Sequence, residues 1–240
     1  MNEVELTISA GRKEPGSLRL VFTLALAGML SGLAVAGVYQ ITKPIIDANK
    51  ARALREAVFE VVPGSAQLQR LAFRDGRLVP LGRDETTTDP VLYAGYDAED
   101  NFLGYAIDGS GPGYQDIIHL IYGYDPQRRR VIGMQVLESR ETPGLGDRIY
   151  RDEAFVAQFS SLAVEPAITV VKEESEAPNA VDAITGATIS SKAVIEIINA
   201  ANGRWLDRLP PAGAEPPAPE GKRGEPMPTS DDGDAAGEGS

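Results

Sequence analysis

The chain opens with a long apolar run. No charged residue occurs from Leu20 to Ile41, and Leu, Val, Ala and Gly make up most of this stretch. About 20 apolar residues are enough to cross the hydrocarbon core of a bilayer as a helix. The pattern therefore predicts a single transmembrane helix over residues 20–41, preceded by an N-terminal segment, residues 1–19.

A cleaved signal peptide is the competing interpretation of this run. Arg12, Lys13 and Arg19 form a positive segment before it, and Ala34-Val35-Ala36 resembles a cleavage site. Apolar residues continue past that site to Ile41, which favours an uncleaved anchor. Basic residues also follow the run, so charge counting leaves the orientation of the helix open.

Small residues are spaced along one side of the predicted span. Gly28 and Gly32 lie four residues apart, and Ala36 continues the row. Such a row lets a second helix approach closely, although small residues are also frequent in membrane helices in general. Both interpretations stand at this point.

Beyond Pro44 the pattern changes twice. Residues Ile45–Val62 have apolar positions at helical spacing and end at Pro63-Gly64, which predicts a helix next to the membrane. Alternating and β-branched runs separated by turn residues then predict an antiparallel meander. Its four strands are expected at Val91–Tyr96, Phe102–Ile107, Ile117–Tyr124 and Arg130–Leu137.

Helical periodicity returns in the last third of the chain. The sequence predicts a helix over Asp147–Phe159, a strand over Ala167–Val171 and a helix over Ile189–Leu206. Strands followed by helices indicate an α+β domain, with the antiparallel sheet flanked by helices, over residues 44–209. After Leu209 the chain is acidic and rich in Pro and Gly, so residues 210–240 are predicted to be a disordered tail.

Composition removes several classes of function. A net charge of −12 argues against a nucleic-acid partner. The chain has no cysteine, so it has no iron–sulfur cluster, disulfide or thiol chemistry of its own. Its one histidine, His119, lies in a predicted strand and is expected to be structural. Any electron that this protein carries must therefore reside on an organic cofactor.

The candidate chemistry lies at the start of the last helix. Asp182-Ala183-Ile184-Thr185-Gly186-Ala187-Thr188 runs directly into the periodic segment, followed by Ser190 and Ser191. The N-terminus of a helix offers unpaired N–H groups and a positive dipole end, which favour a phosphate. The other interpretation is an ordinary helix start, with Thr185, Ser190 or Ser191 as the N-cap and Gly186 as a turn glycine.

A second block, Glu141-Thr142-Pro143-Gly144-Leu145-Gly146, precedes the first by about 40 residues. Its proline fixes φ and its glycines permit close backbone approach, so the loop is rigid and has little side-chain bulk. Leu145 is expected to contact a flat ring, with Thr142 or Glu141 as polar partner. A strand-to-helix turn with Asp147 as helix cap is compatible with the same residues. Gly109 to Tyr114 is a weaker glycine-rich loop that could serve as a lid.

By its first block the chain resembles the FMN-binding domain family, whose pattern is Asp-x-x-(Ser/Thr)-Gly-Ala-Thr. In that family a separate flavin transferase joins the last threonine, through its hydroxyl oxygen, to the phosphate of FMN. The resemblance implies covalent FMN on Thr188, with Thr185, Ser190 and Ser191 near the phosphate and with room left by Gly186 and Ala187. Asp182 would order the turn or assist the transferase.

The second block resembles a loop found in two members of that family. These are the G subunit of the Rnf ion-translocating electron-transport complex and the C subunit of the sodium-translocating NADH:quinone reductase. The resemblance, closer to the Rnf protein, implies a single-pass protein of the bacterial inner membrane with its flavin domain on the periplasmic side. Its partners would be the membrane, Fe–S and flavin subunits of an Rnf-type complex. The alternatives are the quinone-reductase protein and a non-redox, membrane-tethered adaptor.

Overall fold

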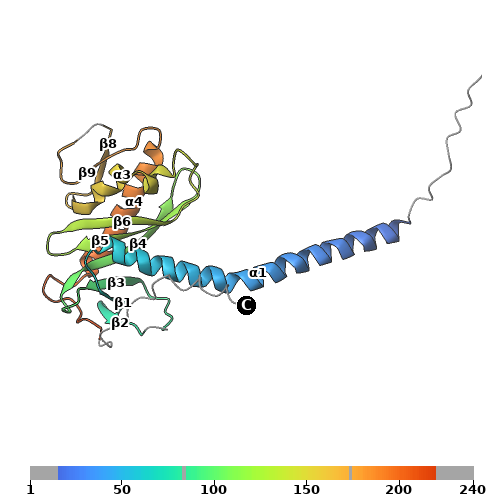
Figure 1. Cartoon of the computed structure of the whole chain (residues 1–240), viewed down its shortest axis with the longest axis horizontal. Coiled ribbons are helices and arrows are strands. Elements are labelled where there is room, and N and C mark those ends of the chain that lie inside the picture. Colours follow the sequence, from blue (N-terminus) through green and yellow to red (C-terminus); the bar gives the residue numbers. More distant parts are fainter. Residues whose placement is uncertain (1–15, 83–84, 173–174, 220–240) are drawn as a thin grey trace, which may run out of the picture. The chain divides into compact units, whose positions relative to one another are not determined.

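The computed structural model describes residues 16–82, 85–172 and 175–219. The chain divides into two units, Met1–Arg52 and Ala53–Ser240. The first unit contains most of one long helix, and the second contains a mixed domain of helices and antiparallel sheet (Figure 1). The predicted α+β class is confirmed in this coarse form.

The long helix α1 (Ser17–Val61) joins two predicted elements into one. Pro44 lies inside it, where the missing N–H removes one helical hydrogen bond without ending the helix. Large apolar side chains from Leu18 to Ile46 are exposed. Among the described residues, α1 is the helix long and apolar enough to cross a membrane. An unburied apolar surface of this length suits a lipid environment.

The domain is built on a seven-stranded sheet whose neighbouring strands are all antiparallel. The order across the sheet is β2-β1-β3-β4-β5-β6-β7. The bounds are Gln67–Arg74 for β1, Arg77–Pro80 for β2, Val91–Tyr96 for β3, Phe102–Pro112 for β4, Ile117–Asp125 for β5, Arg130–Glu138 for β6 and Leu162–Ala163 for β7. The four predicted strands are present as β3 to β6, whereas the hairpin β1–β2 was not predicted.

Helix α4 (Thr188–Trp205) covers one face of the sheet. Gly109 and Gly111 of β4 make room for it, because a Cβ at either position would lie within 2.8 Å of Ile197. From the neighbouring strand β5, the Tyr122 hydroxyl donates to Asn202 Oδ1 at a distance of 2.8 Å. The glycine-rich segment predicted as a lid is therefore the end of a strand, with glycines that admit a helix.

The last turns of α1 cover the opposite face. A Cβ at Gly123 would lie 1.8 Å from the carbonyl oxygen of Val61, and a Cβ at Gly133 would lie 2.9 Å from Val61 Cα. On β3, a Cβ at Gly95 would lie 2.9 Å from Val62 Cγ1. These three glycines on three strands leave room for the end of α1. Ala57, Val58 and Val61 of α1 are buried against the sheet there.

The helix predicted over 147–159 is broken into three short pieces: α2 (Arg148–Arg151), α3 (Glu153–Ala157) and the 3-10 turn η1 (Gln158–Ser161). Asp152 causes the break, because its backbone is extended at φ −84° and ψ 101°. Its carboxylate accepts from Phe155 N–H at 3.3 Å and so begins α3 as an N-cap. Strands β8 (Thr169–Val171) and β9 (Ala180–Asp182) pair in parallel beside these helices.

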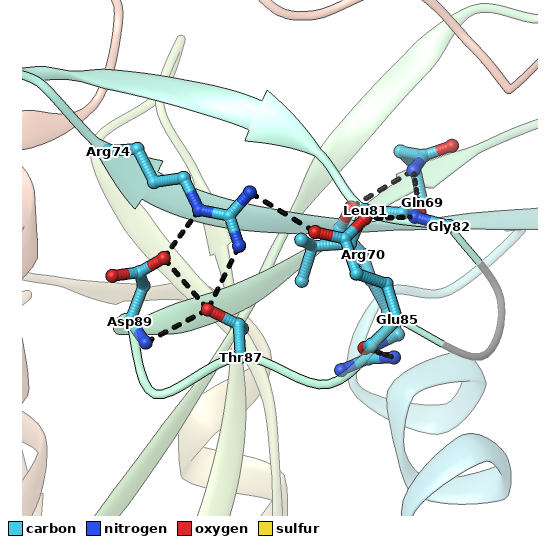
Figure 2. A network of polar contacts seen from close by, with 8 residues as sticks. All are labelled: Gln69, Arg70, Arg74, Leu81, Gly82, Glu85, Thr87 and Asp89. Atoms are coloured by element: carbon cyan, nitrogen blue, oxygen red, sulfur yellow. Dashed lines mark hydrogen bonds and ion pairs between the residues drawn. The ribbon is translucent and has the colours of Figure 1, made fainter.

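A polar network orders the connection that follows β2 (Figure 2). Arg74 donates to Asp89, to Glu85 Oε1 at 3.1 Å and to Thr87 Oγ1 at 3.1 Å. The hydrogen bond from Arg74 lowers the pKa of the Asp89 carboxyl below its usual range. Since the acidic and hydroxyl partners occupy the guanidinium, this network stabilises the loop and leaves little charge to recruit an anion.

The start of the predicted tail is ordered, contrary to the prediction of disorder from Pro210. The Tyr96 hydroxyl donates to the carbonyl oxygen of Pro216 at 2.6 Å, and Ala218 packs against the core. Proline-rich backbone needs little additional ordering, so a few contacts suffice to hold it. The rest of the predicted tail, residues 220–240, and part of the N-terminal segment, residues 1–15, lie outside the described residues.

Candidate functional site

The two sequence blocks, about 40 residues apart in the chain, are in contact in the structure. The Ser190 hydroxyl of α4 donates to the Glu141 carboxylate. A Cβ at Gly146 would lie 3.0 Å from Ser190 Oγ, and one at Gly186 would lie 3.7 Å from Leu145 Cδ2. The loop after β6 and the N-terminus of α4 therefore form one site.

The N-terminus of α4 has no side-chain cap. Ala187 occupies the N-cap position, and no side chain hydrogen-bonds to the first turn there. Ser191 instead orders the preceding turn, since its hydroxyl accepts from Ile184 N–H at 3.1 Å and donates to Ala187 O at 3.0 Å. Gly186 permits that turn with a φ of +85°. The interpretation of Thr185, Ser190 or Ser191 as an ordinary N-cap is therefore wrong.

The four hydroxyl side chains of the first block fall into two groups. Ser190 and Ser191 are buried and bonded within the protein. Thr188 is half-buried and Thr185 is exposed. Within the described parts of the chain, neither threonine hydroxyl has a hydrogen-bond partner. Thr188 alone combines an available hydroxyl with a place at the first residue of the helix.

Glu141 is buried and holds the segments of the site together. It is only 5% exposed, and one carboxylate oxygen accepts from Gln115 N–H at 2.9 Å while the other accepts from Ser190. Thr142 adds a hydrogen bond from its hydroxyl to Gln115 Oε1 at 3.1 Å. The carboxylate thus joins the turn before β5, the second block and α4. Both of its oxygens and the Thr142 hydroxyl are thus engaged in hydrogen bonds within the protein.

Arg148 is a site residue that the sequence analysis missed. Its guanidinium donates to the carbonyl oxygen of Thr185 at 3.1 Å and pairs with Asp152 at 2.7 Å. Because its charge is paired with the Asp152 carboxylate, the guanidinium serves mainly to hold the backbone of Thr185 just before α4. The signal in the sequence was a basic residue two positions after the Gly-Leu-Gly segment, but its partners became visible only in the fold.

Asp147 and Asp182 have supporting positions. Asp147 occupies the N-cap position of α2 as predicted, but its buried carboxylate accepts from Gly144 N–H at 2.7 Å and closes the preceding turn, and it makes no capping hydrogen bond. Gly144 itself has a φ of +77°. The Gln158 amide bonds both the N–H and the carbonyl oxygen of Asp182, at 2.7 and 3.3 Å. Asp182 therefore has a fixed backbone at the end of β9.

Exposed apolar side chains of the domain gather on the segments around this site. Within the described residues of the second unit, the large hydrophobic side chains that are exposed are Tyr114, Ile117, Leu145, Tyr150 and Ile189. Ile189 follows Thr188 directly, and Leu145 lies beside Gly186. A soluble surface rarely groups apolar side chains without a ligand or partner to cover them. The site thus joins an uncapped helix N-terminus to an apolar surface.

Comparison with known proteins identifies the family. The FMN-binding domain family matches residues 113–202, a stretch that contains both sequence blocks and α4. The G subunit of the ion-translocating oxidoreductase complex of Methanosarcina acetivorans is 30% identical over 187 residues, which cover 76% of this chain and 91% of that protein. The chain belongs to this G-subunit family.

A second relative agrees with that assignment, and a solved structure shares the fold. The G subunit of the ion-translocating oxidoreductase complex of Haemophilus influenzae (strain PittEE) is 30% identical over 177 residues, covering 72% of this chain and 82% of that protein. The crystal structure of Shewanella oneidensis NqrC superposes with a TM-score of 0.52 at 16% identity, covering 63% of this chain and 91% of that one. The comparison shows that this member of the G-subunit family shares its fold with NqrC.

Proposed function

We propose that this protein is a membrane-anchored flavoprotein subunit that carries electrons within an Rnf-type ion-translocating complex. Membership of the G-subunit family and the match to the FMN-binding domain family support an electron-transport role with FMN. The absence of cysteine means that no metal–sulfur centre on this chain can share that role. FMN, when bound, supplies the electron-accepting and electron-donating group.

The FMN phosphate is proposed to be esterified to Thr188. The observation that carries this proposal is the half-buried Thr188 hydroxyl, free of protein partners among the described residues, at an uncapped helix N-terminus. Unpaired N–H groups of the first turn favour a phosphate at this place. Gly186 and Ala187 carry too little side chain to block it, and Thr185 has a second hydroxyl within the same turn.

The flavin ring is proposed to cover part of the exposed apolar surface. Leu145 and Ile189 flank the motif from the two blocks and are 52% and 57% exposed. A flat aromatic ring placed on these side chains removes their apolar area from water. In this arrangement Thr142 supplies polar contact at the edge, and Glu141 acts only by holding the two blocks together.

The remaining parts of the proposal concern the membrane and partners. Residues 20–41 of α1 would anchor the chain in the bacterial inner membrane, with residues 1–19 in the cytoplasm and the domain from residue 44 on the periplasmic side. A separate flavin transferase would attach FMN, and the membrane, Fe–S and flavin subunits of the complex would exchange electrons with it. Gly28 and Gly32 offer a face of the helix for such a membrane partner.

Substitution of Thr188 tests the attachment site. Co-expression with a flavin transferase is expected to give an in-gel fluorescent band for the natural chain and for Thr185→Ala, but none for Thr188→Ala. The melting temperature of Thr188→Ala should stay within about 2 °C of the natural one, because its hydroxyl makes no hydrogen bond to the described residues. Covalent flavin that persists in Thr188→Ala would assign the attachment to another hydroxyl. A natural chain that never acquires flavin would favour the adaptor alternative.

A further inference from the structure

The last described residues of the chain form a proline-rich segment that follows the surface of the domain. After η2 (Leu206–Arg208), residues 210–219 contain five prolines, at Pro210, Pro211, Pro216, Pro217 and Pro219. A turn separates the two groups of prolines, since Ala214 N–H donates to Pro211 O at 3.0 Å and Gly213 has a φ of +89°. We name residues 210–219 the strap.

The strap lies against an aromatic cluster of the sheet formed by Tyr96, Phe102 and Tyr105. The Tyr96 and Phe102 rings are 5.8 Å apart, and those of Phe102 and Tyr105 are 4.7 Å apart. Tyr96 donates its hydroxyl to the carbonyl oxygen of Pro216 at 2.6 Å. Ala218 packs against the hydrophobic core to which the three aromatic residues belong or contribute.

The two tyrosines of the cluster differ in what the strap gives them. The Tyr96 hydroxyl has its carbonyl partner, whereas the buried Tyr105 hydroxyl has no hydrogen-bond partner among the described residues. Burial, followed by the Glu215 carboxylate of the strap, raises the pKa of Tyr96 to about 12 and also raises that of Tyr105. Glu215 therefore acts on both hydroxyls.

We propose that Tyr96, Phe102 and Tyr105 form a binding site for an extended proline-rich segment, and that the strap is its ligand within the same chain. Aromatic side chains and a hydroxyl donor are the groups that recognise proline-rich backbone, whose carbonyls are free and whose conformation is already restricted. Tyr96 holds the strap through its hydroxyl, and the three rings provide the surface on which the strap lies.

Cysteine accessibility tests this proposal in the full-length protein, because the natural chain contains no cysteine. Ala218→Cys places a thiol on the packed part of the strap, and Ala214→Cys places one on its exposed turn as a matched control. In the folded protein, a thiol reagent should modify Cys at 218 at least tenfold more slowly than Cys at 214. In denaturant the two rates should agree. Equal rates in the folded protein would overturn the proposal.

Two second-site variants separate a bound ligand from passive packing. Tyr96→Phe should speed modification at 218 about fivefold, as expected for one lost hydrogen bond. Pro217→Ala removes an exposed side chain but frees the backbone of Pro216, so it should speed modification about two- to fivefold. Modification at 214 serves as the control in each variant. Unchanged rates at 218 in Tyr96→Phe and Pro217→Ala would contradict the proposed site.

Discussion

At the residue scale, the candidate site depends on a buried carboxylate whose oxygens form hydrogen bonds within the protein. Glu141 accepts from the backbone of Gln115 and from the hydroxyl of Ser190. Gly113 and Gly146 are small enough to admit it, since a Cβ at these positions would lie 2.5 and 2.7 Å from its oxygens. A buried acceptor with both partners in place fixes geometry, because loss of either partner is costly.

Substitution of Glu141 should therefore reduce stability as well as flavin attachment. Glu141→Ala leaves the buried Ser190 hydroxyl and the partly buried N–H of Gln115 without their acceptor, and we expect a loss of about 2 kcal/mol in the free energy of unfolding. Glu141→Gln keeps one oxygen as an acceptor and has an amide for Ser190, so its loss should be about half as large. Urea unfolding measures both. Equal, negligible losses would show that this carboxylate does not join the segments.

At the element scale, glycines decide how the helices meet the sheet. On one face, Gly109 and Gly111 admit Ile197 of α4; on the other, Gly123 and Gly133 admit Val61 at the end of α1. Both faces of the sheet are therefore in close backbone contact with a helix. The helix that carries the proposed FMN site and the helix that leads from the proposed anchor lie on opposite faces of one sheet.

Gly123→Ala tests the close approach between the sheet and the end of α1. Its Cβ would lie 1.8 Å from a backbone carbonyl, so the helix end or the strand must move, and we expect a loss of more than about 3 kcal/mol in stability. Gly203→Ala in α4 is the matched control, because a Cβ there meets nothing within 4 Å. That variant should gain roughly 0.5–1 kcal/mol from helix propensity. Thermal unfolding of the full-length protein in detergent compares them, and similar melting temperatures would contradict the prediction.

At the scale of the whole molecule, the proposed function is electron transfer from a membrane-anchored domain. Helix α1 is suited to a membrane, and its last turns pack against the sheet of the unit that carries the proposed cofactor site. The sequence contains no cysteine, one histidine in a strand and no dinucleotide-binding glycine fingerprint. On the proposed function, this chain exchanges electrons with partner subunits.

The purified flavin-loaded protein should accordingly fail to oxidise NADH at a useful rate. Its flavin should be reduced once the partner subunits are added, because on the proposed function they deliver the electrons to it. Stopped-flow absorbance follows flavin bleaching in both cases. Rapid bleaching by NADH alone would make the protein a dehydrogenase and reject the carrier proposal.

Much of the fold was predictable because local patterns determine it. Alternating apolar residues located β3 to β6 within a few residues, and helical spacing located α4. The hairpin β1–β2 escaped notice because Gln67–Arg74 mixes polar and apolar residues without clear alternation. The break at Asp152 also went unpredicted, since helical spacing continues through it while the side chain caps the next helix. The strap was missed because its composition resembles that of disordered segments.

The sequence by itself determined the apolar helix, the antiparallel strands and the two motif blocks, because each depends on the residue types of a short continuous segment. Only the tertiary structure decided that Ser190 bonds Glu141, that Arg148 lies at Thr185, and that Ser191 orders the turn and leaves the helix uncapped. It also showed that Gly109 and Gly111 lie on a strand and make room for α4, and that the first part of the predicted tail contacts the domain as the strap. Such contacts join residues distant in the chain. Their geometry follows from packing, which the preferences of single residues do not determine.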